Sequence, residues 1–206
     1  MAGPSDMDGL LANLNWSVPA TAAAVAECER QLGAKLPLEY VEFARTANGG
    51  EGFIGKNAYV ILWGVQELVP MNQAYKVRKY APGLLVFGSD GGGEAYGFDT
   101  RTSRWEIVQV PFVGMAWDLA EPMGTTFIAF LEQLYSIERA CEPVRHGESP
   151  RADCRGKEIF EIDPVILGGS PTDPANKTVL NREDHIKAVV YWNNVIRQMR
   201  EAHRDG

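Results

Sequence analysis

Residues 84–110 read LLVFGSDGGGEAYGFDTRTSRWEIVQV. Three runs rich in apolar and aromatic residues, at 84–88, 94–98 and 104–110, are separated by a glycine-rich turn and a polar turn. Runs bounded in this way are typical of β-strands. Because short turns join them, successive strands must be antiparallel, and the stretch predicts the centre of a β-meander.

Further elements are expected on the N-terminal side of this stretch. A β-branched and aromatic run at 59–63 predicts a fourth strand, and 66–80 predicts a short helix or an irregular crossover. Helices are expected at 21–32 and from Pro37 to the Asn-Gly-Gly sequence at 48–50, because their apolar residues recur at helical spacing. Two short helices therefore open the fold.

An amphipathic helix is expected after the meander, at about 125–141. Its apolar face is the expected cover for one side of the sheet. The residues of that face are Phe127, Phe130, Leu131, Leu134 and Ile137. The predicted fold class is therefore α+β, an antiparallel β-meander flanked by helices, with a C-terminal helical extension.

The chain divides into three parts. We expect a core domain at 16–141, a linker rich in charge, proline and glycine at 142–156, and an extension at 157–206. The extension should contain a strand at 159–167 and a helix at 182–203, capped by Asn181 or Asp184. About 50 residues bury too little surface to fold securely alone, so the extension should dock on the core.

Three side chains of the last helix have expected roles. Trp192 should be largely buried against the body of the protein. Asn193 falls within the apolar stripe and needs hydrogen-bond partners, which the loop at 168–171 would supply. His185 lies in a helix turn, where a solvated or capping histidine is the expected role.

Composition excludes several classes of protein. The 206 residues carry a formal charge of −7 with no basic run, which argues against direct nucleic-acid binding and favours basic partners. No apolar run approaches the roughly 18 to 20 residues that cross a bilayer, and the first residues lack the pattern of a signal peptide. A cytoplasmic protein without a membrane partner is expected.

The cysteines and histidines indicate no metal site. The three cysteines are an odd number without a CxxC pair, which suits a reducing compartment. The series Cys141, His146, Cys154 matches no standard zinc spacing and lacks a fourth ligand. No cofactor is expected.

Two glycine-rich motifs resemble ligand-binding loops and fail. GEGFIGKN at 50–57 approaches the phosphate-binding loop, but Asn57 lacks the hydroxyl that binds magnesium and the loop leads from a helix to a strand. DGGGE at 90–94 has Gly92 and Arg101 at positions three and twelve, where a calcium loop needs ligands. No recognisable nucleophile or metalloprotease motif is present, so no catalytic residue is expected.

The order of these signals resembles the SUKH superfamily, which includes the Smi/Knr cell-wall-assembly regulators. The matching stretches are ERQLGAKLPLEY at 29–40, the Asn-Gly-Gly at 48–50, Trp63, and FGSDGGGEAYGFD at 87–99. The expected helix with Phe127, Phe130 and Leu131 matches the closing helix of the family. The likeness covers a little over half of the chain.

The resemblance implies a protein-binding domain. Most bacterial members of the family are similar to immunity proteins that neutralise a cognate toxin, often a nuclease, in polymorphic or contact-dependent systems. Other members are regulators or scaffolds that bind cellular proteins. The sequence therefore predicts a non-catalytic immunity protein, with a scaffold, or a small enzyme without known motifs, as the alternatives.

The acidic turns supply the predicted partner surface. We expect Asp90, Glu94 and Asp99 to project from one end of the meander beside Tyr96 and Trp105. Acids set the encounter rate with a basic partner, and aromatic residues supply desolvated contact area. The alternative is that the aromatic residues face the core and that the acids only keep the turn solvated.

Overall fold

The computed structural model describes residues 14–55, 58–136 and 157–203. Seven strands form one sheet in which every neighbouring pair is antiparallel and the spatial order follows the chain. These strands are β1 (Leu14–Trp16), β2 (Gly50–Ile54), β3 (Ala58–Leu62), β4 (Leu84–Ser89), β5 (Glu94–Asp99), β6 (Glu106–Pro111) and β7 (Glu121–Gly124). The predicted antiparallel meander is confirmed.

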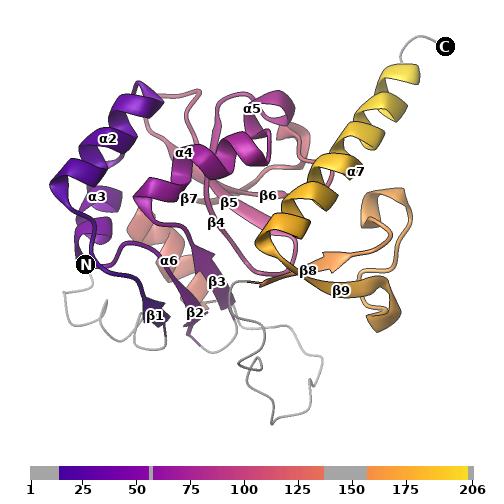
Figure 1. Cartoon of the computed structure of the whole chain (residues 1–206), viewed down its shortest axis with the longest axis horizontal. Coiled ribbons are helices and arrows are strands. Elements are labelled where there is room, and N and C mark those ends of the chain that lie inside the picture. The colour runs from indigo at the N-terminus through magenta and orange to yellow at the C-terminus, as the bar shows by residue number, and fades with distance from the viewer. Residues whose placement is uncertain (1–13, 56–57, 137–156, 204–206) are drawn as a thin grey trace.

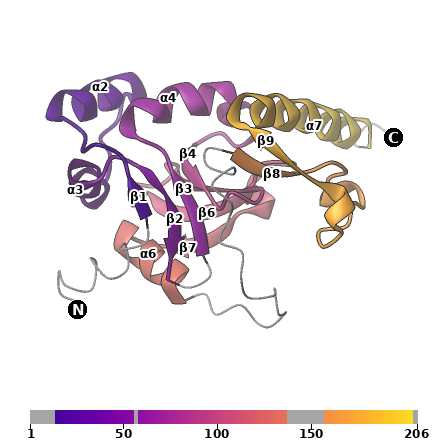
Figure 2. The same ribbon diagram turned by 60° about the horizontal axis from the view of Figure 1, so that its bottom comes forward.

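Helices cover both faces of the sheet. They are α2 (Ala22–Leu32), α3 (Leu38–Thr46), α4 (Val65–Ala74), α5 (Val77–Tyr80), α6 (Phe127–Ser136) and α7 (Arg182–Ala202), with short 3-10 turns at Trp117–Leu119, Val165–Leu167 and Pro174–Asn176. Figure 2 shows α2, α4 and α7 above the sheet and α6 below it. None of the helices within the described ranges has the length and apolar character needed to cross a bilayer.

Local signals explain where the first helix begins and ends. The Thr21 side chain accepts a 3.1 Å hydrogen bond from the backbone N–H of Ala24, which satisfies a donor that the first turn leaves free. Gly33 ends the helix in the left-handed conformation, at φ +68°. The predicted helix at 21–32 is therefore confirmed almost to the residue.

The turn between β4 and β5 is built around one carboxylate. Asp90 Oδ1 accepts hydrogen bonds from the backbone N–H groups of Gly92, at 2.7 Å, and Glu94, at 2.9 Å. Gly91 and Gly93 both have positive φ, +69° and +117°, which a side chain would strain. This end of the meander therefore depends on an aspartate followed by glycines.

An aromatic cluster fills the space between the sheet and the helices α3 and α6. The Tyr40 ring lies 5.3 Å from Phe98 and 5.1 Å from Phe127, and Phe87 lies 5.5 Å from Phe130. The predicted apolar face of α6 is buried at each of its described positions, while Ile137 lies outside the described residues. The cluster therefore holds α3 and α6 against the sheet from which the surface loops project.

Several elements differ from the sequence-based expectation. Strands β1, β2 and β7 were not expected, because each is short and Gly50–Ile54 is rich in glycine. Trp105 lies outside β6 and has a left-handed backbone, at φ +49°, so the expectation that the strand at 104–110 includes it is wrong.

The C-terminal segment forms a hairpin and a helix. Its strands are β8 (Lys157–Glu161) and β9 (Lys177–Asn181), which pair antiparallel in a sheet of their own. Asn181 caps α7 by accepting a 3.0 Å hydrogen bond from the N–H of Asp184. Figure 1 shows this hairpin and helix on the right of the seven-stranded sheet. The predicted linker at 142–156, with Cys141, lies outside the described residues.

The contacts and burial of α7 correct three expectations. Asn193 bonds the backbone of Gly114 and Phe112 rather than the loop at 168–171. His185 is only 1% exposed and lies 2.8 Å from the Tyr75 hydroxyl, so it is neither solvated nor a cap. Trp192 is only partly buried, although it packs against the core.

Candidate functional site

The predicted partner residues lie at two ends of one strand. Glu94 begins β5 and Asp99 ends it. Asp90 belongs to the turn beside Glu94, and Trp105 follows the turn beside Asp99. The expectation of three acids gathered at one end of the meander is therefore wrong, because an antiparallel strand separates its two turns by its full length.

Tyr96 points into the core. It is 3% exposed, and its ring lies 5.0 Å from that of Phe130. Burial raises the pKa of its hydroxyl above the usual range. The alternative reading, in which the aromatic residues face the core, holds for this residue.

The C-terminal hairpin packs against the end of the sheet that carries Asp90 and Glu94. The N–H of Ile159 donates a 2.9 Å hydrogen bond to the carbonyl of Gly91, inside the acidic turn. Ser89 Oγ donates to the carboxylate of Glu158, at 2.9 and 3.1 Å from its two oxygens. Much of this end is therefore already in contact with another part of the same chain.

Burial alters the acids at this junction. It raises the pKa of Glu94 to about 7, with the nearby Asp90 carboxylate as the next cause. It also raises the pKa of Glu158 to about 7, even though the Ser89 hydroxyl stabilises the charged form. Both carboxyl groups are therefore partly protonated near neutral pH.

A cavity of about 470 Å³ lies beside these groups, and both Glu94 and His185 line it. Burial lowers the pKa of His185 to about 4, which keeps the imidazole neutral against Tyr75. Titratable groups in a cavity suggest catalysis, but burial alone accounts for the His185 shift. None of the residues lining the cavity is a serine, threonine, cysteine or lysine, and the described residues hold no group of three metal-ligating side chains.

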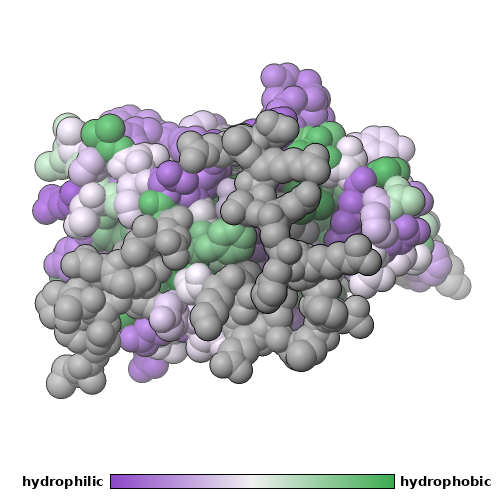
Figure 3. Space-filling view, turned by 90° about the horizontal axis from the view of Figure 1, so that it is seen from below, coloured by the Kyte–Doolittle hydropathy of each residue, from purple (hydrophilic) through white to green (hydrophobic). Residues whose placement is uncertain are grey.

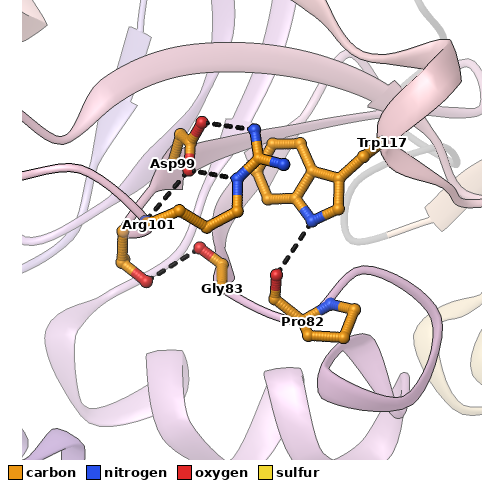
Figure 4. Close-up of polar contacts among 6 residues, drawn as sticks. Pro82, Gly83, Asp99, Arg101 and Trp117 are labelled. Carbon is orange, nitrogen blue, oxygen red and sulfur yellow. Dashed lines mark hydrogen bonds and ion pairs between the residues drawn. The ribbon is translucent and has the colours of Figure 1, made fainter.

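The opposite end of β5 carries an Arg–Trp pair, in which the arginine is exposed and the tryptophan is partly buried. The guanidinium of Arg101 lies 3.4 Å from the centre of the Trp117 ring. Asp99 holds it with two hydrogen bonds, from Nε at 2.9 Å and from an Nη at 2.7 Å. Figure 4 shows the guanidinium between the Asp99 carboxylate and the indole. The Arg101 side chain nevertheless remains 49% exposed.

Backbone groups fix the geometry of this pair. The indole N–H of Trp117 donates a 2.8 Å hydrogen bond to the carbonyl of Pro82 (Figure 4). Gly83 has φ +87°, and a Cβ there would lie 2.5 Å from Cγ of Arg101. Thr100 bonds the Gly83 carbonyl through both its N–H and its hydroxyl. Arg101 therefore lies in a defined position. Its hydrogen bonds to Asp99 lower the pKa of the Asp99 carboxyl group, because the guanidinium stabilises the charged form.

A groove of about 1060 Å³ lies beside this pair, and Pro82, Gly83 and Thr100 line it. It runs between the end of α2, the helices α4 and α5, and the start of β4, and Trp105 lines it. The Trp105 ring also packs against Phe98, at 5.9 Å. Of the predicted site residues, Asp99 and Trp105 therefore lie at this end, next to Arg101.

A second apolar surface lies on the C-terminal hairpin. Ile159 and Val179 are cross-strand partners in β8 and β9 and are 42% and 48% exposed. Figure 3 shows hydrophobic surface among hydrophilic residues at the right-hand end of the face seen from below, where the hairpin lies. This surface is distinct from the Arg101 end of the sheet.

Sequence reasoning missed Arg101 and Trp117. They are 16 positions apart, and only the return of the chain after β6 brings them together. The one available signal was the Asp-Thr-Arg turn at 99–101, where an aspartate accepts from the N–H two residues later. That signal predicts the turn but gives no indication of the indole.

Comparison with known protein families gives a match. The sequence model described as SMI1 / KNR4 family (SUKH-1) matches residues 19–133, more than half of the chain and all of the sheet from β2 to β7. No curated protein matches the sequence.

Proposed function

Because the chain belongs to the SMI1/KNR4 family (SUKH-1), we propose that it is a non-catalytic immunity protein. It binds a cognate toxin of a polymorphic or contact-dependent system in the cytoplasm and blocks its action. A net charge of −7 favours the approach of a basic toxin such as a nuclease.

The observation that carries the proposal is the Arg101–Trp117 pair. Tryptophan and arginine are the residues most enriched among those that dominate binding energy at protein interfaces. Here Asp99, Pro82 and Gly83 hold both side chains in place before any partner arrives. A preorganised pair loses little conformational entropy on binding, so more of its contact energy contributes to affinity.

The proposed surface includes Asp99 and Trp105 and extends the earlier prediction to Arg101 and Trp117. Asp90 and Glu94 lie at the hairpin end of the sheet. Reversing their charge should weaken binding only if the partner contacts both ends of the sheet. Nanomolar inhibition corresponds to about −12 kcal/mol, which a few well-placed anchors of this kind supply.

The test needs the partner. The full chain, carrying a photo-reactive amino acid at position 118 beside Trp117, is cross-linked in its native cells and the attached protein is identified by mass spectrometry. That protein is then expressed alone and together with the full chain. We expect growth arrest when it is alone and growth when both are present.

Two variants assign the rescue to the surface. Arg101→Ala should reduce rescue, because it removes an exposed anchor without touching the core. Ile159→Ser with Val179→Ser, on the other exposed surface, is the control and should rescue like the wild type. A partner that is harmless when expressed alone would contradict the immunity role and support a scaffold that binds cellular proteins.

A further inference from the structure

The groove beside Arg101 has an apolar floor. Leu32, Val69 and Leu84 line it from α2, α4 and β4, and Trp105 lines it from the turn before β6. Its volume, about 1060 Å³, is at the upper limit of the roughly 300 to 1,000 Å³ typical of small-molecule sites. The groove is therefore large enough for several residues of a peptide with an apolar side chain.

Basic residues surround this floor. Lys76, Arg78 and Lys79 all line the groove and are exposed. Within the described ranges, none of the three forms an ion pair with a carboxylate. Three uncompensated cations gathered at one groove stand out in a chain whose net charge is −7.

The C-terminal helix orients one of these cations. The ammonium group of Lys79 donates a 2.6 Å hydrogen bond to the side-chain oxygen of Asn194, and the Tyr80 hydroxyl donates to the same oxygen at 3.1 Å. The position of the Lys79 ammonium group is thus restricted by an uncharged partner. The extension takes part in shaping the rim of the groove.

Two strained residues lie in the same groove. Lys76, at φ +55°, and Trp105, at φ +49°, are the two non-glycine residues with positive φ among the described positions. Both line this groove, on different elements. The left-handed conformation is sterically unfavourable for a residue that carries a Cβ. Strain of this kind persists where the surrounding structure enforces it, and it clusters at ligand-binding sites.

From these observations we infer that the groove binds an acidic segment of the partner protein. An apolar side chain of that segment packs on Leu32, Leu84 and Trp105. Carboxylates on either side of it meet Lys76, Arg78 and Lys79. The inference rests on the proposed function, because it names the chemistry of the partner that this surface meets.

Charge and shape favour a peptide over a nucleic acid. Three cations neutralise three phosphates at most, and the affinity this supplies falls steeply with salt. The net charge of −7 also repels a polyanion at longer range. A short acidic segment carries only a few negative charges, so this repulsion is small. Its apolar side chain also gains binding energy by packing against the apolar residues that line the groove.

Selection from a random 12-residue peptide library on the immobilised full chain tests the inference. We expect selected peptides to be enriched in Asp and Glu around an aromatic or aliphatic residue. The variant Lys76→Glu, Arg78→Glu, Lys79→Glu should bind a synthetic copy of the best peptide at least tenfold more weakly. The control Lys157→Glu, Lys177→Glu, Arg200→Glu makes the same charge change at exposed positions elsewhere and should bind like the wild type.

The outcomes separate this inference from the proposed function. Selected peptides without acidic enrichment, equal binding by the two triple variants, or equally tight binding of a 12-nucleotide single-stranded DNA would overturn the acidic-segment inference. The immunity proposal would stand in each case if the cross-linked partner is toxic and the chain rescues growth. Thermal unfolding of both triple variants confirms that the substitutions leave the fold intact.

Discussion

The side-chain oxygen of Asn193 accepts a 2.6 Å hydrogen bond from the backbone N–H of Gly114. The amide nitrogen of the same side chain donates to the carbonyl of Phe112 at 2.8 Å. One buried amide on α7 thus satisfies two backbone groups of the loop that follows β6. This polar contact between the C-terminal helix and the core lies beside the buried apolar residues Val189 and Ile196 of the same helix.

Replacing Asn193 with alanine should lower the free energy of unfolding by about 1–3 kcal/mol, because it leaves the Gly114 N–H and the Phe112 carbonyl buried without partners. Urea unfolding measures the change. Gln198→Ala, at an exposed position on the same helix, is the control and should change stability by less than about 0.5 kcal/mol. Equal stability of the two variants would show that water replaces the lost contacts.

Deleting residues 157–206 should lower the melting temperature of the remaining chain. The deletion uncovers apolar core that Phe160, Val189 and Ile196 now bury, and it removes the partner of the Tyr75 hydroxyl. Differential scanning calorimetry of the full and shortened chains measures the effect. An unchanged melting temperature would mean that 157–206 is a separate unit.

Glu158→Gln should stabilise the protein at pH 8 and flatten its pH dependence. The pKa of Glu158 is raised from 4.5 to about 7 in the folded state, so the folded protein binds a proton that the unfolded chain releases. The stability from that proton is full below about pH 4.5 and is lost as the pH rises to 7. Between these values, wild-type stability should fall by about 1.4 kcal/mol per pH unit more than that of the variant.

Chemical unfolding at several pH values between 4.5 and 8 measures this difference. His185 has the opposite sign, because its pKa is lowered to about 4, but it is present in both proteins and cancels in the comparison. Glu106→Gln makes the same substitution at an exposed position and is the control. Parallel profiles for Glu158→Gln and the wild type would mean that Glu158 ionises at its ordinary pKa.

Lys76→Gly should be more stable than Lys76→Ala by about 1 kcal/mol, because glycine adopts φ +55° without the steric cost that any Cβ imposes. Both variants lose the same charge, so the comparison isolates the backbone. Thermal or urea unfolding measures the difference. If alanine were as stable as glycine, the backbone at this position would not be strained in solution.

The centre of the fold was readable from sequence because its signals are local. The Asp-Gly-Gly-Gly turn at 90–93 fixes the pairing of β4 with β5 through hydrogen bonds among adjacent residues. The Phe127 face of α6 has the helical period that a buried helix needs. By contrast, β2 is rich in glycine, and its strand character comes from pairing with β1 and β3.

The candidate site was only half readable for the same reason. Asp99 is recognisable from the sequence as part of a polar turn, and Trp105 as an aromatic residue suited to a binding surface. Both lie at the end of the sheet that we propose for binding. Trp117 reaches Arg101 through tertiary structure, and the left-handed Lys76 follows from packing that no local pattern encodes. The hairpin contact at Gly91 likewise joins segments nearly 70 residues apart.

The order of the sheet has a consequence for how the protein is made. Each of the seven strands pairs only with its neighbours along the chain. When a strand leaves the ribosome, the preceding strand with which it pairs has therefore already been synthesised. The sheet is thus able to assemble from β1 onward during synthesis, which proceeds at about 5–20 residues per second. The β8–β9 hairpin and α7 follow β7 in the chain, so they emerge after all seven strands of the sheet.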